Sequence, residues 1–432
     1  MGKWHLGHNG SLPTQRGFDF FFGPPYSHDE GYPGPFPISY IWPAVPVYRN
    51  EEIIEQPIEM ETFTDRLIAE VLSFIDTAQA NGVPFFIYIA FLEPHIPAFA
   101  SPRNVGRSRG GRYGDMVEQM DEAVGIIMDR VREVGNTFVV FTSDNGAWPD
   151  AQEPFTPEDA EQGDGGSNGA FYEGKASTWE GGHRTPTIAW FPERIPGGRT
   201  VQHITSHLDF FPTVLDYAGV PLPPGRVYDG KSIVPLLNGE SEEPPHEFLF
   251  YWRERTLMAV RYGRYKGHFI TRSGFGNDEP VHHSPMMLFD LERDLGEQFP
   301  MNVTNYPDIV NAILAAADAH RAQMTWGEPQ FDVGGTLLGQ SWKVVPCCQK
   351  QNIAPYLASD APPDEWGLII WKDCNCAQPN GTAVPAYPAH AADDGYVPPY
   401  LFANTQFRGQ PLQAYREAVL DAARAKQQQQ QP

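Results

Sequence analysis

The feature of this sequence that most constrains its fold is an alternation of helix and strand patterns between residues 64 and 143. Residues 64–80 (TDRLIAEVLSFIDTAQA) place apolar side chains at helical spacing, and residues 84–91 (PFFIYIAF) form a continuous apolar run of strand length. Residues 115–134 (DMVEQMDEAVGIIMDRVREV) and 136–143 (NTFVVFTS) repeat this order. Strands that are apolar on both faces and alternate with helices predict an α/β fold with a mixed, mainly parallel sheet flanked by helices.

Composition limits the classes of protein and partner. The chain has 432 residues, of which 41% are hydrophobic, so it is globular and long enough for more than one core. Its formal net charge of −23 repels nucleic acid and anionic membranes. An anionic substrate therefore requires a local basic pocket. No run approaches the roughly eighteen apolar residues of a membrane span.

Both predicted strands end on polar side chains. The first runs into Glu93-Pro94-His95, and the second into Ser143-Asp144-Asn145-Gly146. Asp-Asn-Gly alone is more often a turn than a metal site. However, ligands of such sheets bind beyond the carboxyl ends of the strands, and here two successive strands deliver polar groups to one edge. The Asp144 carboxylate and the Asn145 carbonyl are hard oxygen ligands that suit calcium or magnesium.

Two further segments carry cationic side chains beside glycines. Lys3 and His5 stand two residues apart at the start of the chain, and Lys175 begins the string KASTWEGGHR. Taken alone, the second segment is a glycine-rich loop with solvated or paired cations. Beside the other segments, Lys175 becomes a candidate point charge for an oxyanion.

The cysteines leave three alternatives open. They occur as Cys347-Cys348 and Cys374-x-Cys376, which match zinc-ligand spacing poorly. Disulfides in an oxidising compartment are favoured over zinc and over free buried thiols. Asn-x-Ser/Thr triplets at Asn9, Asn302 and Asn380 fit an exported glycoprotein, although such triplets also occur by chance.

Several strings, taken in order, resemble the sulfatases of the alkaline-phosphatase-like superfamily. They are GKWHLG, GFDFFFGPPYSHD, EPHIP, TSDNG and GKASTWEGGHRTP, followed by AVRYGRYKGHFI and MMLFDLERDLGEQFP. The chain most resembles the arylsulfatase A and N-acetylgalactosamine-6-sulfatase group, and the strings extend over most of residues 1–345. No single string is decisive, whereas the ordered set is specific. The resemblance implies hydrolysis of sulfate esters on sugars or aryl groups.

The resemblance also implies a role for each matching residue. A sulfate ester spreads negative charge over its oxygens, so its hydrolysis requires clustered cations, a metal and an in-line nucleophile. The implied roles are sulfate and nucleophile contacts for Lys3 and His5, a polar pocket contact for Ser27, sulfate binding with assistance to the leaving group for His95, sulfate binding for Lys175, and half of a calcium site for Asp144 and Asn145.

One element of the family pattern is absent from the sequence. Sulfatases carry an Asp-Asp metal pair and a Cys-x-Pro-x-Arg signature, whose cysteine becomes the formylglycine nucleophile, upstream of Lys-x-His. This chain has no cysteine before Cys347, and the near match Ser11-Leu12-Pro13 fails because Arg16 falls one position too late. We therefore expect that the N-terminal part of the domain is missing and that the chain as written is inactive. A secreted, lysosomal or lumenal location is implied, with no signal visible.

The expected organisation has three parts. Residues 1–245 form the catalytic domain, 246–345 a smaller antiparallel-sheet subdomain, and 346–432 an extension with a disordered glutamine-rich end. In the subdomain, the strings FLFYW, LMAVRYG, YKGHFI and MMLFDL predict antiparallel strands packed by a helix over 307–324.

Two other functions stay open at this point. A phosphatase or phosphodiesterase of the same superfamily would use a similar metal edge, but would hold further Asp and His ligands. A non-catalytic protein that binds an anion or sugar is favoured by the missing nucleophile. The expected partner is a sulfated small molecule or glycan, and a homo-oligomer is possible.

Overall fold

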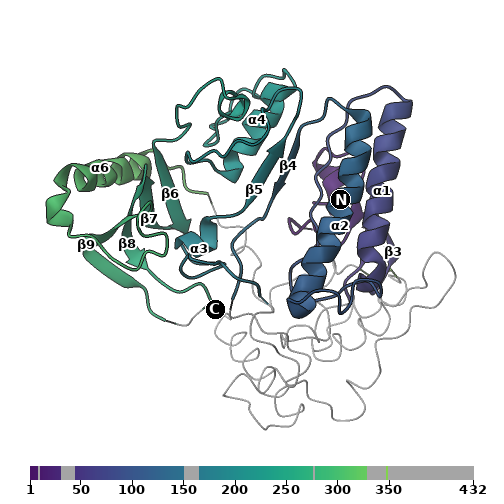
Figure 1. Cartoon of the computed structure of the whole chain (residues 1–432), viewed down its shortest axis with the longest axis horizontal. Coiled ribbons are helices and arrows are strands. Elements are labelled where there is room, and N and C mark those ends of the chain that lie inside the picture. The colour runs from purple at the N-terminus through teal and green to yellow at the C-terminus, as the bar shows by residue number, and fades with distance from the viewer. Residues whose placement is uncertain (8–9, 31–43, 150–164, 276–277, 328–346, 349–432) are drawn as a thin grey trace, which may run out of the picture. The chain divides into compact units, whose positions relative to one another are not determined.

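A computed structural model describes residues 1–7, 10–30, 44–149, 165–275, 278–327 and 347–348 (Figure 1). The chain divides into two compact units. Of the described residues, the first unit comprises those within 1–133 together with 165 and 347–348, and the second comprises those within 134–149 and 166–327. This division differs from the expected domains, whose boundaries at 245 and 345 stay a prediction.

Two long helices dominate the first unit, and they lie side by side in Figure 1. Helix α1 spans Met60–Ala80 and helix α2 spans Gly111–Val134, which confirms both predicted helices with starts four residues earlier. Each helix ends at a glycine-containing turn, as the sequence indicated. The guanidinium of Arg130 on α2 donates to Asp76 on α1 at 2.7 Å.

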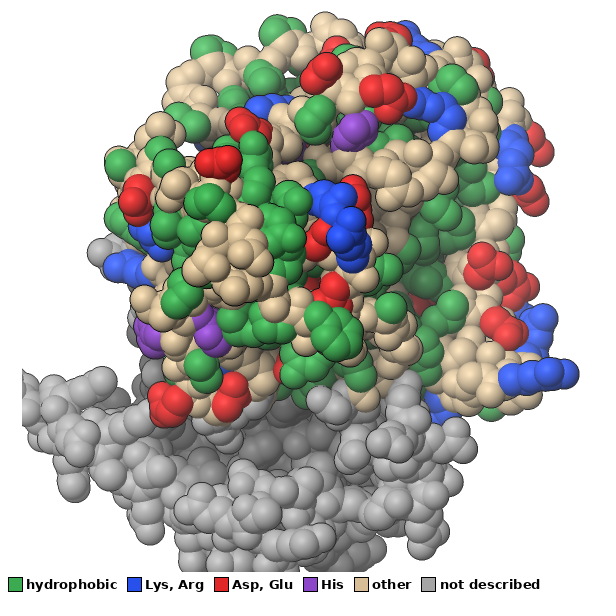
Figure 2. Space-filling model, turned by 60° about the vertical axis from the view of Figure 1, so that its left-hand side comes forward, with side chains coloured by type: hydrophobic (Ala, Val, Ile, Leu, Met, Phe, Trp, Pro, Cys, Tyr) green, Lys and Arg blue, Asp and Glu red, His purple; other side chains and the backbone are tan. Residues whose placement is uncertain are grey.

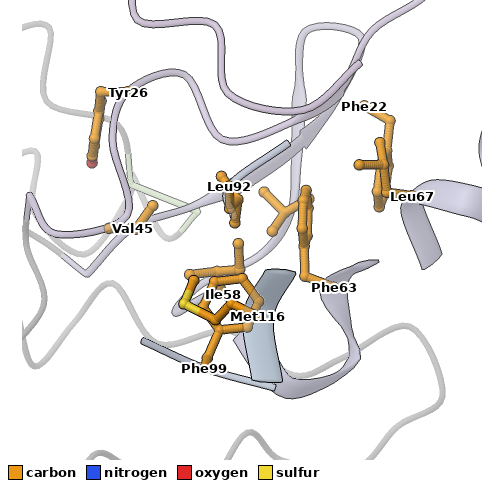
Figure 3. Close-up of a cluster of buried hydrophobic side chains, with 10 residues drawn as sticks. Phe22, Tyr26, Val45, Ile58, Phe63, Leu67, Leu92, Phe99 and Met116 are labelled. Atoms are coloured by element: carbon orange, nitrogen blue, oxygen red, sulfur yellow. The ribbon is translucent and has the colours of Figure 1, made fainter. Parts of the chain in front are cut away.

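The core of the first unit forms where these helices meet the segments around them (Figure 3). Phe22 stacks on Phe63 of α1 with ring centroids 5.7 Å apart. Leu67, Leu92 and Met116 are almost fully buried in the same cluster. Burial of such side chains stabilises a fold by about 1.5–3 kcal/mol each. The apolar faces read from helical spacing are therefore the faces that pack.

Short strands complete the first unit. Strands β1 (Phe22–Gly23), β2 (Val47–Arg49) and β3 (Glu52–Glu55) form an antiparallel sheet in that order, and a 3-10 helix, η1, spans Pro13–Arg16. Parallel pairing among the described residues occurs where Gly2 bridges Ala90. There the Met1 amino group donates to Tyr88 O at 2.7 Å, and Ala90 N and Lys3 N continue the ladder at 2.9 Å each.

The run PFFIYIAF (residues 84–91) is more exposed to solvent than its sequence predicted. Its backbone pairs with the chain start, as a strand should, but Phe86 and Tyr88 are 58% and 54% exposed. Phe18 stacks on Phe86 with ring centroids 6.1 Å apart, yet both side chains of the run stay more than half exposed, so an unbroken apolar run did not imply burial on both faces.

The second unit contains two sheets. Strand β4 (Val139–Thr142), which lies within the predicted strand 136–143, pairs antiparallel with β5 (Thr187–Trp190). The short helices between and after them are α3 (Glu180–His183), η3 (His207–Asp209), α4 (Phe210–Tyr217) and α5 (Val234–Asn238). Apart from the Gly2–Ala90 bridge, the strand pairs of the described residues are antiparallel.

The predicted antiparallel sheet is confirmed in residues 248–290. Strands β6 (Phe248–Arg253), β7 (Thr256–Tyr262), β8 (Tyr265–Thr271) and β9 (Val281–Asp290) pair in sequence order. Helix α6 (Pro307–Gln323) follows the 3-10 helix η4 (Val303–Asn305) and packs on this sheet (Figure 1). Val260, Leu288 and Ile313 are fully buried between them.

The structure also bears on the expectations about surface charge, membrane spans and the cysteines. On the face shown in Figure 2, acidic and basic side chains are interspersed rather than segregated. Within the described residues no helix is long and apolar enough to cross a membrane. Cys347 and Cys348 are both disulfide-bonded, which favours the disulfide alternative. Asn9, Asn380, Cys374, Cys376 and the glutamine-rich end lie outside the described residues.

Candidate active site

The start of the chain is held between two other segments of the first unit. On one side Lys3 N donates to Ala90 O at 2.9 Å, and on the other Gly2 N donates to Phe22 O at 2.8 Å. A Cβ on Gly2 would lie 1.9 Å from Ala90 O, so only glycine permits this approach. Lys3 is thereby placed on rigid backbone. His5 is exposed, and its Nε2 lies 3.2 Å from Glu30 Oε1.

His95 lies at the end of the run 84–91, on a turn closed by His95 N donating to Leu92 O at 3.0 Å. Its Nδ1 lies 2.6 Å from Ile96 O, and 4.0 Å from Oδ1 of Asp29. Burial raises the pKa of Asp29, but the nearby His95 and the Ser27 hydroxyl outweigh burial and lower it below its usual value. The Asp29 carboxylate is therefore charged beside the histidine ring.

A second histidine, His28, supports the His95 turn from inside. His28 is fully buried, and its Nε2 lies 3.1 Å from His95 O and 3.3 Å from Pro97 O. Its ring meets the His95 ring edge to face at 5.6 Å. Burial, with a smaller contribution from His95, lowers the pKa of His28 to about 3. A neutral His28 thus donates to the carbonyls that fix the His95 backbone.

In the second unit, Asp144 and Asn145 follow β4 directly. Asp144 Oδ1 accepts from Asn145 N at 2.9 Å, and Asn145 Nδ2 donates to Gly146 O at 3.0 Å. Gly146 N donates to Gly182 O, and a Cβ on Gly146 would lie only 1.6 Å from Gly181 O. The close approach of two backbones therefore fixes the turn that carries Asp144 and Asn145.

The Lys175 loop packs on the residues after this turn. Lys175 N donates to Ala147 O at 2.9 Å, and a Cβ on Gly174 would lie 2.3 Å from the same oxygen. The Asn168 side chain accepts from Ala147 N at 2.8 Å and donates to Ala147 O at 3.0 Å. Asn145 and Lys175, thirty positions apart, are thereby brought onto adjoining loops.

A buried charge network anchors the other end of the Lys175 loop. Lys266 on β8 contacts Glu180 Oε1 at 3.0 Å and Glu297 Oε1 at 3.1 Å, and all three side chains are almost fully buried. Burial alone would raise the pKa of Glu180, but Lys266, Arg184 and Arg261 lower it to about 2. Glu297 Oε2 also accepts from Glu180 N at 2.7 Å. The C-terminal sheet thus holds α3, which carries Gly181 and Gly182.

The oxygen donors fit a hard divalent cation in type. Calcium takes about 6–8 oxygen ligands, of which Asp144 and Asn145 provide two side chains. Within the described ranges, no group of three or more His, Cys, Asp or Glu side chains is placed to hold a metal ion. Asp144 and Asn145 also line an open hollow of about 1900 Å³ in the second unit.

The structure groups the predicted site residues within each unit. In the first unit, Ser27 and His95 adjoin Asp29, and the backbone of Lys3 pairs with Ala90, five residues before His95. In the second unit, Asn145 and Lys175 lie near each other because the Lys175 backbone contacts Ala147. That the two groups form one pocket stays a prediction. The sequence interpretation missed four supporting residues. His28 and Asp29 stood inside the string PPYSHDE, whereas Asn168 and Glu180 had no local signal beyond their loops.

Family models match most of the chain. A model described as Sulfatase matches residues 1–220, and one described as C-terminal region of aryl-sulfatase matches residues 244–356. The first covers all seven predicted site residues.

Individual proteins agree with these matches. The chain is 37% identical over 369 residues to N-acetylgalactosamine-6-sulfatase of Canis lupus familiaris, covering 77% of this chain and 67% of the relative. It is 37% identical over 386 residues to the Sus scrofa protein of the same name, covering 81% and 70%. A crystal structure of the PsFucS1 sulfatase from Pseudoalteromonas sp. superposes with a TM-score of 0.63 at 24% identity, covering 74% of this chain and 69% of that chain. This likeness confirms the alkaline-phosphatase-like fold class.

Proposed function

The chain belongs to the sulfatase family, and from that premise we propose that it recognises sulfate esters of sugars. Its relatives are named as sulfatases, which are enzymes that hydrolyse sulfate esters. Two of them are named for N-acetylgalactosamine 6-sulfate, which makes this sugar the natural first probe. With 54 acidic and 31 basic residues, the protein as a whole repels anions. A local cationic pocket is therefore needed to hold the ester.

The packing of the Asn145 and Lys175 loops is the observation that carries this proposal. Asn145, the proposed cation ligand, and Lys175, the proposed sulfate-binding lysine, lie on adjoining backbone in the second unit. In the proposed site, Lys3, His5, Ser27 and Lys175 bind the sulfate oxygens. A divalent cation would be held by Asp144 and Asn145 and would neutralise further charge on the ester.

His95 is the proposed proton donor to the departing alcohol. Its Nδ1 is directed at Ile96 O, so Nε2 is the ring nitrogen assigned to the leaving oxygen. The charged Asp29 carboxylate lies 4.0 Å from Nδ1 and helps to orient the ring. His28 keeps the turn in place. Asp29 and His28 are thus positioning residues.

The proposed nucleophile is a formylglycine, which in this family derives from a cysteine. No cysteine precedes Cys347, so residues 1–432 alone do not provide it in the expected sequence context. We therefore propose that this chain by itself binds sulfate esters without appreciable turnover, since covalent catalysis without a nucleophile has no first step. A non-catalytic protein that binds sulfated sugars stays the alternative proposal.

The proposed location is secreted, lysosomal or otherwise lumenal. The disulfide-bonded Cys347 and Cys348 support it, because such bonds persist in oxidising compartments. A sulfated small molecule or glycan is the proposed partner. Calcium and a homo-oligomer stay predictions.

Replacing Lys175 by Ala is expected to weaken binding of N-acetylgalactosamine 6-sulfate by roughly ten-fold or more, because a partly desolvated charge contact to an anion is lost. Isothermal titration of the parent chain and the variant measures this. Lys231→Ala is the matched control, since its Nζ donates to Pro245 O elsewhere in the second unit. In parallel assays with an aryl sulfate and an aryl phosphate, we expect no appreciable turnover of either ester. Turnover of the phosphate but not the sulfate would contradict the proposal.

A further inference from the structure

Two aromatic side chains contact each other beside the Lys175 loop. The Trp148 and Phe275 ring centroids are 4.1 Å apart, with the planes inclined by 31°. Phe275 is 51% exposed, and Trp148 is half-buried. The pair therefore offers apolar ring surface to solvent next to the loop of a candidate sulfate-binding residue. These rings come from loops that are 127 positions apart in the sequence.

Trp148 is fixed by its two neighbours. Ala147 O accepts from Lys175 N at 2.9 Å, and Pro149 Cδ would lie 2.8 Å from a Cβ on Gly174. The residues on both sides of the tryptophan therefore press on the Gly174–Lys175 backbone. The indole is attached to a segment that cannot shift without moving Lys175.

Phe275 is fixed to the same lysine from another element. A Cβ on Gly274 would lie 2.3 Å from Lys175 O, so the loop between β8 and β9 rests directly on Lys175. Arg253 on β6 holds that loop, because its guanidinium donates to Ser273 O at 2.7 Å and to Gly274 O at 3.0 Å. Both rings are thus carried on segments whose backbones contact the backbone of one candidate sulfate-binding residue.

We propose that Trp148 and Phe275 form a platform for the pyranose ring of a sulfated sugar whose sulfate is held by Lys175. The inference rests on the proposed role of Lys175. A pyranose has an apolar face of C–H groups, which packs on aromatic rings while its hydroxyls remain solvated. Free sulfate has no such face. The platform therefore distinguishes a sulfated sugar from inorganic sulfate, which the cationic group alone does not do.

Isothermal titration of the full chain with three probes tests the platform. The probes are N-acetylgalactosamine 6-sulfate, N-acetylgalactosamine and sodium sulfate. We expect Trp148→Ala and Phe275→Ala each to weaken binding of the sulfated sugar by roughly five- to ten-fold, the range of a good aromatic contact. Sulfate affinity should stay unchanged. Phe211→Ala is the matched control, because Phe211 is 49% exposed and stacks on Tyr228 at 5.7 Å elsewhere in this unit.

Three outcomes would overturn the platform. They are an unchanged affinity for the sulfated sugar in both variants, an equal loss of affinity for inorganic sulfate, and an equal effect of Phe211→Ala. Failure of the proposed function gives a different pattern. In that case Lys175→Ala leaves binding of the sulfated sugar intact. The ratio of the affinity for the sulfated sugar to the affinity for inorganic sulfate, compared between the parent and the Trp148 and Phe275 variants, still tests the platform.

Discussion

Replacing Lys266 by Met is expected to lower the free energy of unfolding by about 3–5 kcal/mol, the usual cost of removing one partner from a buried ion pair. The ammonium of Lys266 is fully buried and contacts Glu180 and Glu297 at 3.0 and 3.1 Å. It also lies 4.3 Å from the centroid of the Tyr251 ring. Methionine preserves most of the volume but leaves two buried carboxylates without their shared cation. Urea unfolding followed by circular dichroism measures the change.

Two further variants separate charge from packing. Lys231→Met removes a solvent-accessible lysine and should change stability by less than about 0.5 kcal/mol. Adding Glu297→Gln to Lys266→Met should recover part of the loss, because it removes one uncompensated charge. A Lys266→Met protein as stable as the parent would contradict this assignment of the network.

The pH dependence of the network has a definite sign. The pKa of Glu180 is lowered in the folded state to about 2 from a usual 4.5. Its contribution to stability is therefore complete above about pH 4.5 and is lost as the pH falls toward 2. The urea unfolding of Lys266→Met should therefore be measured near neutral pH, where Glu180 makes its full contribution to stability.

The second large effect concerns acid and His28. The pKa of His28 is lowered from 6.5 to about 3, so between these values the unfolded chain binds a proton that the folded chain does not. Stability then falls as the pH drops from 6.5 to 3, by up to about 5 kcal/mol at roughly 1.4 kcal/mol per pKa unit. His28→Gln should flatten this dependence, since a glutamine amide still donates to a carbonyl but does not titrate.

Unfolding curves between pH 7 and pH 3.5 check this expectation. His203→Gln serves as the control, because His203 is a partly exposed histidine beside Glu242 at 3.4 Å. The control should retain the dependence of the parent. Identical slopes for the parent and His28→Gln would show that His28 is not held neutral in the folded protein.

Local patterns predicted the elements that depend on local physics. The 3.6-residue spacing of apolar side chains located α1, α2 and α6, since helix burial follows that period. The hairpins β6 to β9 were found because their turns and apolar runs are short and adjacent. For the site, the order of strings placed Asn145 and Lys175, which the structure brings onto adjoining loops.

Long-range pairing was beyond these patterns. Glu180 meets Lys266 and Glu297 across 86 and 117 positions, and no periodicity relates them. Trp148 and Phe275 lie in loops whose approach depends on how β4 and β8 are arranged. A histidine such as His28 has the same sequence signature whether it is buried or exposed. Packing decides that difference, and packing is set by the whole fold.

A crystal structure of the chain with N-acetylgalactosamine 6-sulfate tests the central claim most directly. The account predicts that the sulfate lies within hydrogen-bond distance of Lys3, His95 and Lys175, beside Asp144 and Asn145, with the pyranose ring against Trp148. A sulfate bound elsewhere, or Lys3 and Lys175 on opposite sides of the folded chain, would contradict it.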